Sequence, residues 1–163
     1  MPQLLLMRHG KAVQGDGVAD RERALTRRGV RDSEKIARVI ARDFPPDRIL
    51  CSPALRTRQT LAAMTPVIGT VRDAIFLDDL YDPPGDYLAV LSANADAAER
   101  LLVIGHNPAV QETAVTLTGS GERALRTELR EKFPTSAVAV IALAGPWQAV
   151  EPLSGSLVAF LTP

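Results

Sequence analysis

The chain has 163 residues, a length that suits one domain with a substantial hydrophobic core. Nineteen basic and nineteen acidic residues leave no net charge, so no global field draws the chain to nucleic acid or to an anionic membrane. The longest apolar stretch, residues 137–144, is too short to span a bilayer, and the sequence starts without the basic residues of a secretory signal. With a single cysteine, Cys51, these features predict a cytoplasmic protein that has no internal disulfide.

Strand-like and helix-like patterns alternate along the chain. Short apolar runs at residues 4–7, 49–51 and 101–104 predict buried parallel strands. Apolar residues at helical spacing from Val30 to Ile40 predict an amphipathic helix that begins after a Thr26 cap and ends near Phe44.

Three further helices and a β-rich tail are predicted in the rest of the chain. Ser52-Pro53 and Asn107-Pro108 each predict a helix start, because each is a capping residue followed by proline. Residues 87–91 predict another helix, whereas residues 137–143 and 150–161 indicate β-structure. Gly119-Ser120-Gly121 is interpreted as a loop rather than a nucleotide cradle, because no lysine-serine or lysine-threonine pair follows it.

This alternation predicts an α/β fold with three layers, in which a mostly parallel central sheet carries helices on both faces. We expect one domain over residues 1–163. Ligands of such sheets bind beyond the carboxyl ends of the strands, which places His9, Ser52 and His106 at one edge. Arg56 lies in the first turn after Ser52-Pro53, and its side chain can reach back to the same edge.

The only two histidines of the chain, His9 and His106, both lie at this predicted edge. Together with Arg8 and Arg56 they would form a compact cationic pocket that suits a tetrahedral dianion. One imidazole can attack phosphorus in line while the other helps to hold charge on the equatorial oxygens. Ser52 is interpreted as a helix cap or as a phosphate ligand, and the two roles are compatible.

Four motifs in order along the chain resemble those of the histidine phosphatase superfamily, and in particular its SixA-like phosphohistidine phosphatases. They are Leu4-Leu5-Leu6-Met7-Arg8-His9-Gly10-Lys11-Ala12, Leu25-Thr26-Arg27-Arg28-Gly29, Ser52-Pro53-Ala54-Leu55-Arg56-Thr57-Arg58-Gln59-Thr60, and Val103-Ile104-Gly105-His106-Asn107-Pro108. The resemblance extends to Phe133-Pro134-Thr135-Ser136-Ala137 and implies a phosphoglycerate-mutase-like fold. It also implies that His9 is the phosphorylated nucleophile, that Arg8 and Arg56 bind the phosphoryl group, that His106 completes the pocket, and that no metal or cofactor takes part.

The proton donor is the weakest point of the correspondence. Many family members carry glutamate where this chain has Asp79, and a shorter aspartate reaches less far. Asp79 is therefore interpreted either as the catalytic acid or as a surface carboxylate. A leaving imidazole that is already protonated on its other nitrogen needs no strong acid. A cysteine phosphatase is disfavoured, because only four residues separate Cys51 from Arg56 where that phosphate loop has five.

The sequence thus predicts a metal-independent phosphatase that acts on phosphohistidine of a signalling protein, such as a histidine phosphotransfer or phosphocarrier domain. The spacing of the motifs leaves little chain for a lid, so an open pocket would admit a protein surface. A small-molecule phosphomonoesterase and a non-catalytic phosphoprotein-binding module remain the alternatives. Neither nucleic acid nor membrane is an expected partner.

Overall fold

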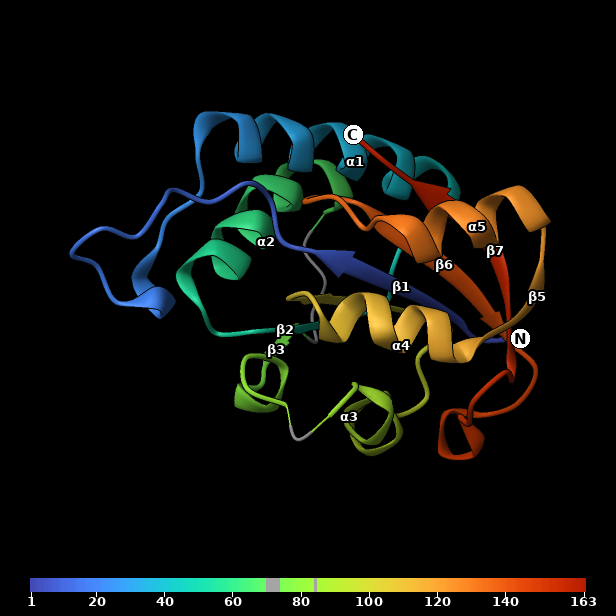
Figure 1. Cartoon of the computed structure of the whole chain (residues 1–163). Coiled ribbons are helices and arrows are strands. Elements are labelled where there is room, and N and C mark those ends of the chain that lie inside the picture. Colours follow the sequence, from blue (N-terminus) through green and yellow to red (C-terminus); the bar gives the residue numbers. More distant parts are fainter. Residues whose placement is uncertain (70–73, 84) are drawn as a thin grey trace.

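The computed structural model describes residues 1–69, 74–83 and 85–163, which form one seven-stranded sheet with helices on both faces. The strand order is β3-β2-β4-β1-β6-β7-β5 (Figure 1). The strands are β1 (Gln3–Arg8), β2 (Arg48–Cys51), β3 (Ala74–Phe76), β4 (Arg100–Gly105), β5 (Thr118–Gly121), β6 (Val138–Leu143) and β7 (Gly155–Leu161). The α-helices are α1 (Arg27–Asp43), α2 (Leu55–Ile68), α3 (Leu88–Asn94), α4 (Ala109–Leu117) and α5 (Arg123–Glu131).

The sheet is mostly parallel, as predicted. Strand β1 pairs in parallel with β4, which pairs in parallel with β2, and β2 in turn pairs with β3. Strand β6 runs antiparallel to both β1 and β7, and β5 is parallel to β7. The three predicted apolar runs therefore lie side by side at the centre of the sheet.

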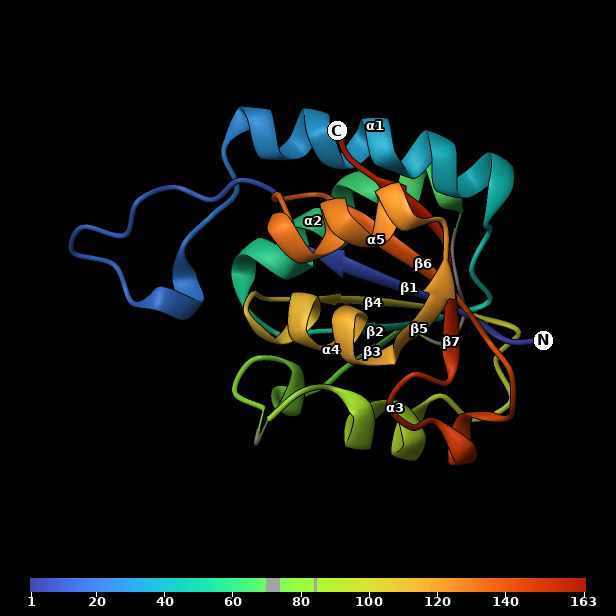
Figure 2. The same cartoon turned by 45° about the vertical axis from the view of Figure 1, so that its right-hand side comes forward.

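Two apolar clusters hold the three layers together. Helices α1 and α2 cover one face through residues such as Ile36, Ile40 and Met64, whereas α3, α4 and α5 cover the other through Leu91 and Val110, among others. Figure 2 shows α1 along the top of the molecule and α3 along the bottom, with the strands between them. No helix among the described residues is both long and apolar enough to cross a membrane.

The amphipathic helix α1 confirms the prediction made from its apolar spacing. Thr26 caps it by accepting a hydrogen bond from the Gly29 N–H (3.0 Å), and its buried face includes Ile36, Ala37 and Ile40. The helix ends at Asp43, next to the predicted boundary at Phe44. The first turn of the helix packs directly against the backbone of Lys11, just after β1, because Gly29 has no side chain. A Cβ on Gly29 would collide with that backbone.

Several sequence expectations are wrong in detail. Helix α2 begins at Leu55 and α4 at Ala109, so neither Ser52 nor Asn107 is the N-cap residue. The glycine-rich residues 118–121 form edge strand β5 rather than a loop, because they pair with β7. The final strand begins only at Gly155, after a short 3-10 helix at Trp147–Ala149, and the sequence reading missed α5.

Candidate active site

The carboxyl ends of β1, β2 and β4 meet at one edge of the sheet, and each is followed by a predicted site residue. The parallel ladder continues past the strands: the His9 N–H donates to the Gly105 carbonyl, and the Ser52 N–H donates to the Ile104 carbonyl. This backbone pairing brings His9, Ser52 and His106 together, although they are separated by more than forty residues each along the chain.

A pocket of about 210 Å³ opens at this edge. All four predicted residues Arg8, His9, Arg56 and His106 line it, together with Lys11 and Arg23. The two imidazole rings are tilted relative to each other, with ring centroids 5.2 Å apart and planes inclined by 54°. Among the described residues that line the pocket, none carries a carboxylate.

The local backbone fixes the tautomer of His9. Its Nδ1 lies 2.7 Å from the Gly10 carbonyl oxygen, and a carbonyl can only accept, so Nδ1 carries the proton. The lone pair is then on Nε2, which is the nucleophilic position. The Gly10 N–H donates to the Thr60 hydroxyl on α2 (3.0 Å), and a Cβ at Gly10 would press on the Gly29 carbonyl and the Ser33 hydroxyl. Glycine is therefore required at position 10.

His106 is held from two sides. Its backbone N–H donates to the Tyr87 hydroxyl (3.1 Å), and its Nε2 lies 2.7 Å from the Ser52 hydroxyl. Because that hydroxyl already accepts weakly from the Ala54 N–H, we assign its proton to the bond with His106 Nε2. The remaining ring proton is then on Nδ1, which is buried and has no partner among the described residues. Ser52 thus orients His106 and does not itself line the pocket.

Arg8 is anchored by the segment that leads into β6. It donates from Nη1 to the Phe133 carbonyl (2.9 Å), and its Nε is buried without a partner in the described chain. The Ser136 N–H donates to the carbonyls of both Arg8 and His9, so the same segment also holds the end of β1. Residues 133–137, to which the family resemblance extends, therefore hold Arg8 and the end of β1 in position.

Arg56 is almost fully buried in the first turn of α2, with 5% of its surface exposed. It donates from Nη1 to the Asp20 backbone carbonyl (2.7 Å) and from Nη2 to Asp20 Oδ2 (3.0 Å). Its Nε, like that of Arg8, is buried and lacks a partner within the described residues. Arg8, Arg56 and His106 all line the pocket, and each has one buried N–H without a partner among the described residues. Two guanidinium groups in one pocket without a carboxylate favour the binding of an oxyanion.

Both histidines are neutral at physiological pH. The pKa of His9 is lowered from 6.5 to about 4, mainly by burial and in part by the charges of Arg56, Arg8 and Arg23, against the opposing effect of the hydrogen bond to Gly10. Burial likewise lowers the pKa of His106 to about 3, assisted by His9 and Arg56. A neutral imidazole beside permanently charged guanidinium groups is able to attack a phosphoryl group.

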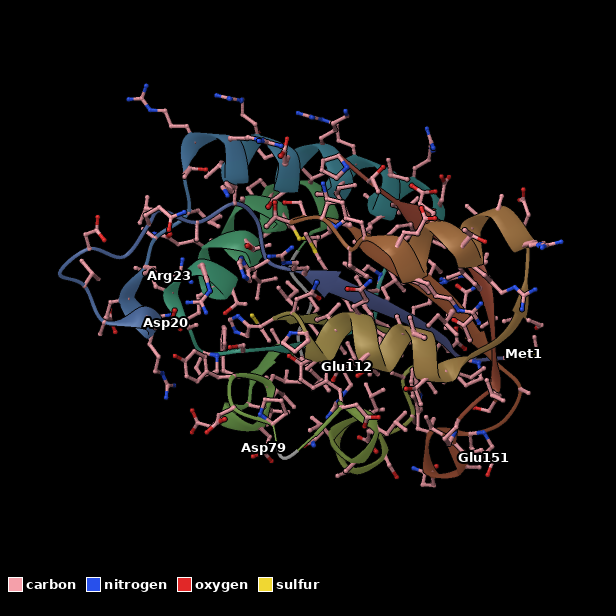
Figure 3. All side chains as sticks on the ribbon, viewed as in Figure 1. Met1, Asp20, Arg23, Asp79, Glu112 and Glu151 are labelled. Carbon is pink, nitrogen blue, oxygen red and sulfur yellow. The ribbon has the colours of Figure 1, made fainter. Side chains whose placement is uncertain are left out.

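The structure also places residues that the sequence reading did not single out. Arg23 lines the pocket and donates from Nε to Asp20 Oδ1 (3.0 Å). Figure 3 shows the two labelled residues next to each other. Tyr81 packs edge-on against the ring of His106, with centroids 5.5 Å apart. The Leu25 N–H, just before the Thr26 cap, donates to the Gln59 side chain and so connects the segment between β1 and α1 to α2. The sequence signal that could have found Arg23 was its position, since it is a polar residue just before the Leu25-Thr26 motif.

Asp79, the tentative acid, lies outside this pocket. It is exposed in the short 3-10 helix η2 (Asp78–Leu80), and Figure 3 shows it below that helix, away from Asp20 and Arg23. It is not among the residues that line the pocket. The role of Asp79 as proton donor therefore gains no geometric support from the structure.

No group of three or more His, Cys, Asp or Glu side chains that could hold a metal ion occurs within the described parts of the chain. Cys51 is buried at the end of β2, and burial raises the pKa of its thiol to about 12. A thiol with so high a pKa is a poor nucleophile at neutral pH, which agrees with the sequence argument against a cysteine phosphatase.

Comparisons with known proteins agree with this geometry. The model of the histidine phosphatase superfamily (branch 1) matches residues 4–82. Phosphohistidine phosphatase SixA of Escherichia coli is 32% identical over 148 residues, which cover 86% of this chain and 85% of that protein. The chain belongs to the histidine phosphatase superfamily.

Two further similarities extend over nearly the whole chain. An uncharacterized protein of Mycobacterium tuberculosis is 38% identical over 161 residues, covering 96% of this chain and 99% of its own length. A solved structure from Nakamurella multipartitia, of a protein assigned as a phosphohistidine phosphatase SixA, superposes with a TM-score of 0.85 at 30% identity, covering 99% of this chain and 96% of that one. These similarities confirm the predicted fold class and identify the chain as a SixA-like hydrolase of the phosphatase type.

Proposed function

We propose that this chain removes phosphate from phosphohistidine side chains of other proteins, through a covalent intermediate on His9 and without a metal or other cofactor. The observation that carries the proposal is the ring of His9, whose Nδ1–H is bound to the Gly10 carbonyl and whose free Nε2 shares a pocket with Arg8, Arg56 and His106. The similarity to SixA of Escherichia coli supports the choice of phosphohistidine.

In the first step His9 Nε2 attacks phosphorus while the P–N bond of the substrate breaks. The electron pair of that bond returns to the substrate imidazole, which leaves as the neutral ring if its other nitrogen already carries a proton. The guanidinium groups of Arg8 and Arg56 and the His106 imidazole, which line the pocket, would bind the phosphoryl oxygens during transfer. No proton is required from the enzyme.

In the second step water attacks the phosphorus atom of phospho-His9. The P–N bond to Nε2 breaks, its electron pair returns to His9, and both protons of the water remain on dihydrogen phosphate as it leaves. His9 Nδ1 keeps its proton and its bond to Gly10 throughout, so the ring returns to its starting tautomer. The two steps use the same P–N chemistry, which explains how one pocket serves both.

The substrate class follows from what the pocket provides. An alkoxide leaving group needs a proton, yet the described residues lining the pocket supply no carboxylate, and Asp79 lies elsewhere. A protonated imidazole does not have this need. The partners we expect are therefore histidine phosphotransfer or phosphocarrier proteins in signal transduction rather than small phosphate monoesters.

Phosphate release from a matched panel tests the proposal. The panel comprises a chemically phosphorylated histidine protein, a phosphoserine peptide and a sugar phosphate at equal concentration. We expect phosphohistidine to be hydrolysed with the highest kcat/KM, and a base-stable, acid-labile phosphoenzyme to be trapped on His9. His9→Ala should abolish turnover while its circular dichroism stays that of the wild type.

Two results would contradict the proposal in different ways. Preference for the sugar phosphate would identify a small-molecule phosphomonoesterase that uses the same pocket. Tight binding of phosphohistidine protein without any phosphate release by the wild type would identify a binding module.

A further inference from the structure

Asp20 is the residue that holds the outer side of the Arg56 guanidinium. It opens a short 3-10 helix (Asp20–Glu22) in the segment between β1 and α1, which projects from the body of the molecule at the left of Figure 1. Its backbone carbonyl and Oδ2 accept from Arg56, its Oδ1 accepts from Arg23, and its Oδ2 also accepts from the Tyr81 hydroxyl (2.7 Å). One exposed carboxylate thus joins two pocket arginines to an aromatic ring.

Tyr81 is itself fixed against the pocket wall. Its ring packs edge-on against His106, and the Arg21 guanidinium carbon lies 4.7 Å from the ring centroid. Arg21 in turn forms an exposed ion pair with Asp78 (2.9 Å). The ring is held mainly by His106, because the exposed Arg21–Asp78 ion pair contributes little, and the Arg56 guanidinium carbon also lies 6.0 Å from the ring centroid.

Arg56 lines the pocket, whereas Asp20 does not. Asp20 accepts one N–H from each of Nη1 and Nη2, so three of the five N–H groups of the guanidinium have no partner among the described residues. An arginine side chain has several rotatable bonds, so a contact that holds both Nη atoms restricts the direction in which the remaining N–H groups point. A phosphoryl group would otherwise have to order this side chain itself.

We propose that Asp20, held by the Tyr81 hydroxyl, is a positioning residue that orients Arg56 for the phosphoryl group of the substrate. The proposal rests on the proposed function only in taking a phosphoryl group as the ligand of Arg56. The contacts persist at neutral pH, because the bond from Tyr81 and the Arg56 charge keep the pKa of Asp20 well below its ordinary value, and the bond to Asp20 raises the pKa of Tyr81.

The direction in which anion affinity changes when the Asp20 carboxylate is removed tests the proposal, because the two possible roles of Asp20 predict opposite changes. If Asp20 competed with phosphate for Arg56, its removal would free a cation and tighten anion binding. If Asp20 positions Arg56, its removal loosens the guanidinium and weakens binding. Because the Asp20 side chain is 54% exposed, its substitution is not expected to threaten the fold.

The experiment compares Asp20→Asn and Tyr81→Phe with Asp78→Asn, which breaks the Arg21 ion pair of the same segment without touching Arg56. Tungstate binding is measured by calorimetry, and kcat and KM are measured with phosphohistidine protein. We expect Asp20→Asn to weaken tungstate binding and to lower kcat/KM by about fivefold or more, and Tyr81→Phe by about two- to threefold. Asp78→Asn should stay within about twofold of the wild type.

The same substitutions in an Arg56→Lys background show whether Asp20 acts through Arg56. An ammonium group has no fork to orient, so Asp20→Asn should have little further effect there. Tighter tungstate binding by Asp20→Asn, a change no larger than that of Asp78→Asn, or an undiminished effect beside Arg56→Lys would each overturn the proposal. Tungstate binding needs no turnover, so failure of the phosphohistidine assay alone would count against the proposed function and not against the role of Asp20.

Discussion

The two buried histidines should make the stability of this protein depend on pH in a window where few other groups titrate. In the folded chain the pKa of His9 is about 4 and that of His106 about 3, whereas both have the ordinary value of 6.5 when the chain unfolds. Their folded pKa values are depressed, so below 6.5 the unfolded state binds protons that the folded state excludes. Stability is therefore full above pH 6.5 and falls as the pH is lowered toward 4.

The size of the effect follows from the difference in bound protons. Between pH 6 and pH 5 each histidine should lower the free energy of unfolding by about 1.2 kcal/mol, and the pair by about 2.4 kcal/mol. Asp20 does not disturb this window, because its contribution is lost only as the pH falls below its ordinary pKa of 3.8. A change of this size is a sizeable part of the stability of a typical domain.

Urea unfolding at pH 6 and pH 5 measures the effect, with the fluorescence of the buried Trp147 as the probe. Phosphate buffers must be avoided, because an anion bound in the pocket would itself stabilise the fold. In His9→Gln the loss should be about half that of the wild type, since burial is the main cause of the shift at each ring and His106 keeps its own. A wild-type loss under about 0.5 kcal/mol, or an equal loss in His9→Gln, would refute the reasoning.

Four further predictions concern the pocket. Arg56→Lys should lower kcat/KM by at least about tenfold in a phosphate-release assay, because an ammonium cannot replace the planar fork, whereas Arg58→Lys on the exposed side of the same helix should have no effect. Arg23→Gln should raise KM severalfold with a smaller change in kcat, since Arg23 lines the pocket beside the phosphate-binding groups. Dialysis against a chelator should leave activity unchanged, and recovery of lost activity on adding magnesium or zinc would contradict the metal-free mechanism. Asp79→Asn should leave phosphohistidine hydrolysis within about twofold, and a selective loss of alkyl phosphate hydrolysis would restore Asp79 as an acid.

The residues that follow the central strands could be placed from the sequence because each depends on a local rule. An apolar run predicts a buried strand, and parallel strands bring their carboxyl ends to one edge, which was enough to group His9, Ser52 and His106. Arg56 joined them through the direction of a helical side chain. These inferences need no knowledge of how distant loops fold.

The helix starts could not be read in the same way. Ser52-Pro53 has the composition of a cap and first turn, yet the Ser52 hydroxyl contacts His106 Nε2, fifty-four positions away, and the helix begins at Leu55. The Ser52 hydroxyl keeps only a weak local bond from the Ala54 N–H (3.4 Å), whereas its bond to His106 is short (2.7 Å). A tertiary hydrogen bond thus takes precedence over the local capping preference at this residue.

Asp20 and Tyr81 were out of reach of sequence reasoning for a related reason. Neither lies in a periodic element, and their contacts join the segment before α1 to the short helix η2, sixty-one residues apart. Only the fold brings them to Arg56. Asp79 shows the opposite case, since its position along the chain matches an expected acid while the structure does not place it among the residues that line the pocket.

The arginines of the pocket have two effects on His9 that act at different stages. Their charges help to keep the free ring unprotonated, and their donors then bind the phosphoryl group that the ring attacks. Burial is nevertheless the largest cause of the lowered pKa, so His9 remains neutral at pH 7 even when one guanidinium is replaced. The loss in Arg56→Lys should therefore come from poor binding and orientation of the phosphoryl group, and raising the pH from 7 to 8 should not restore the activity of that variant.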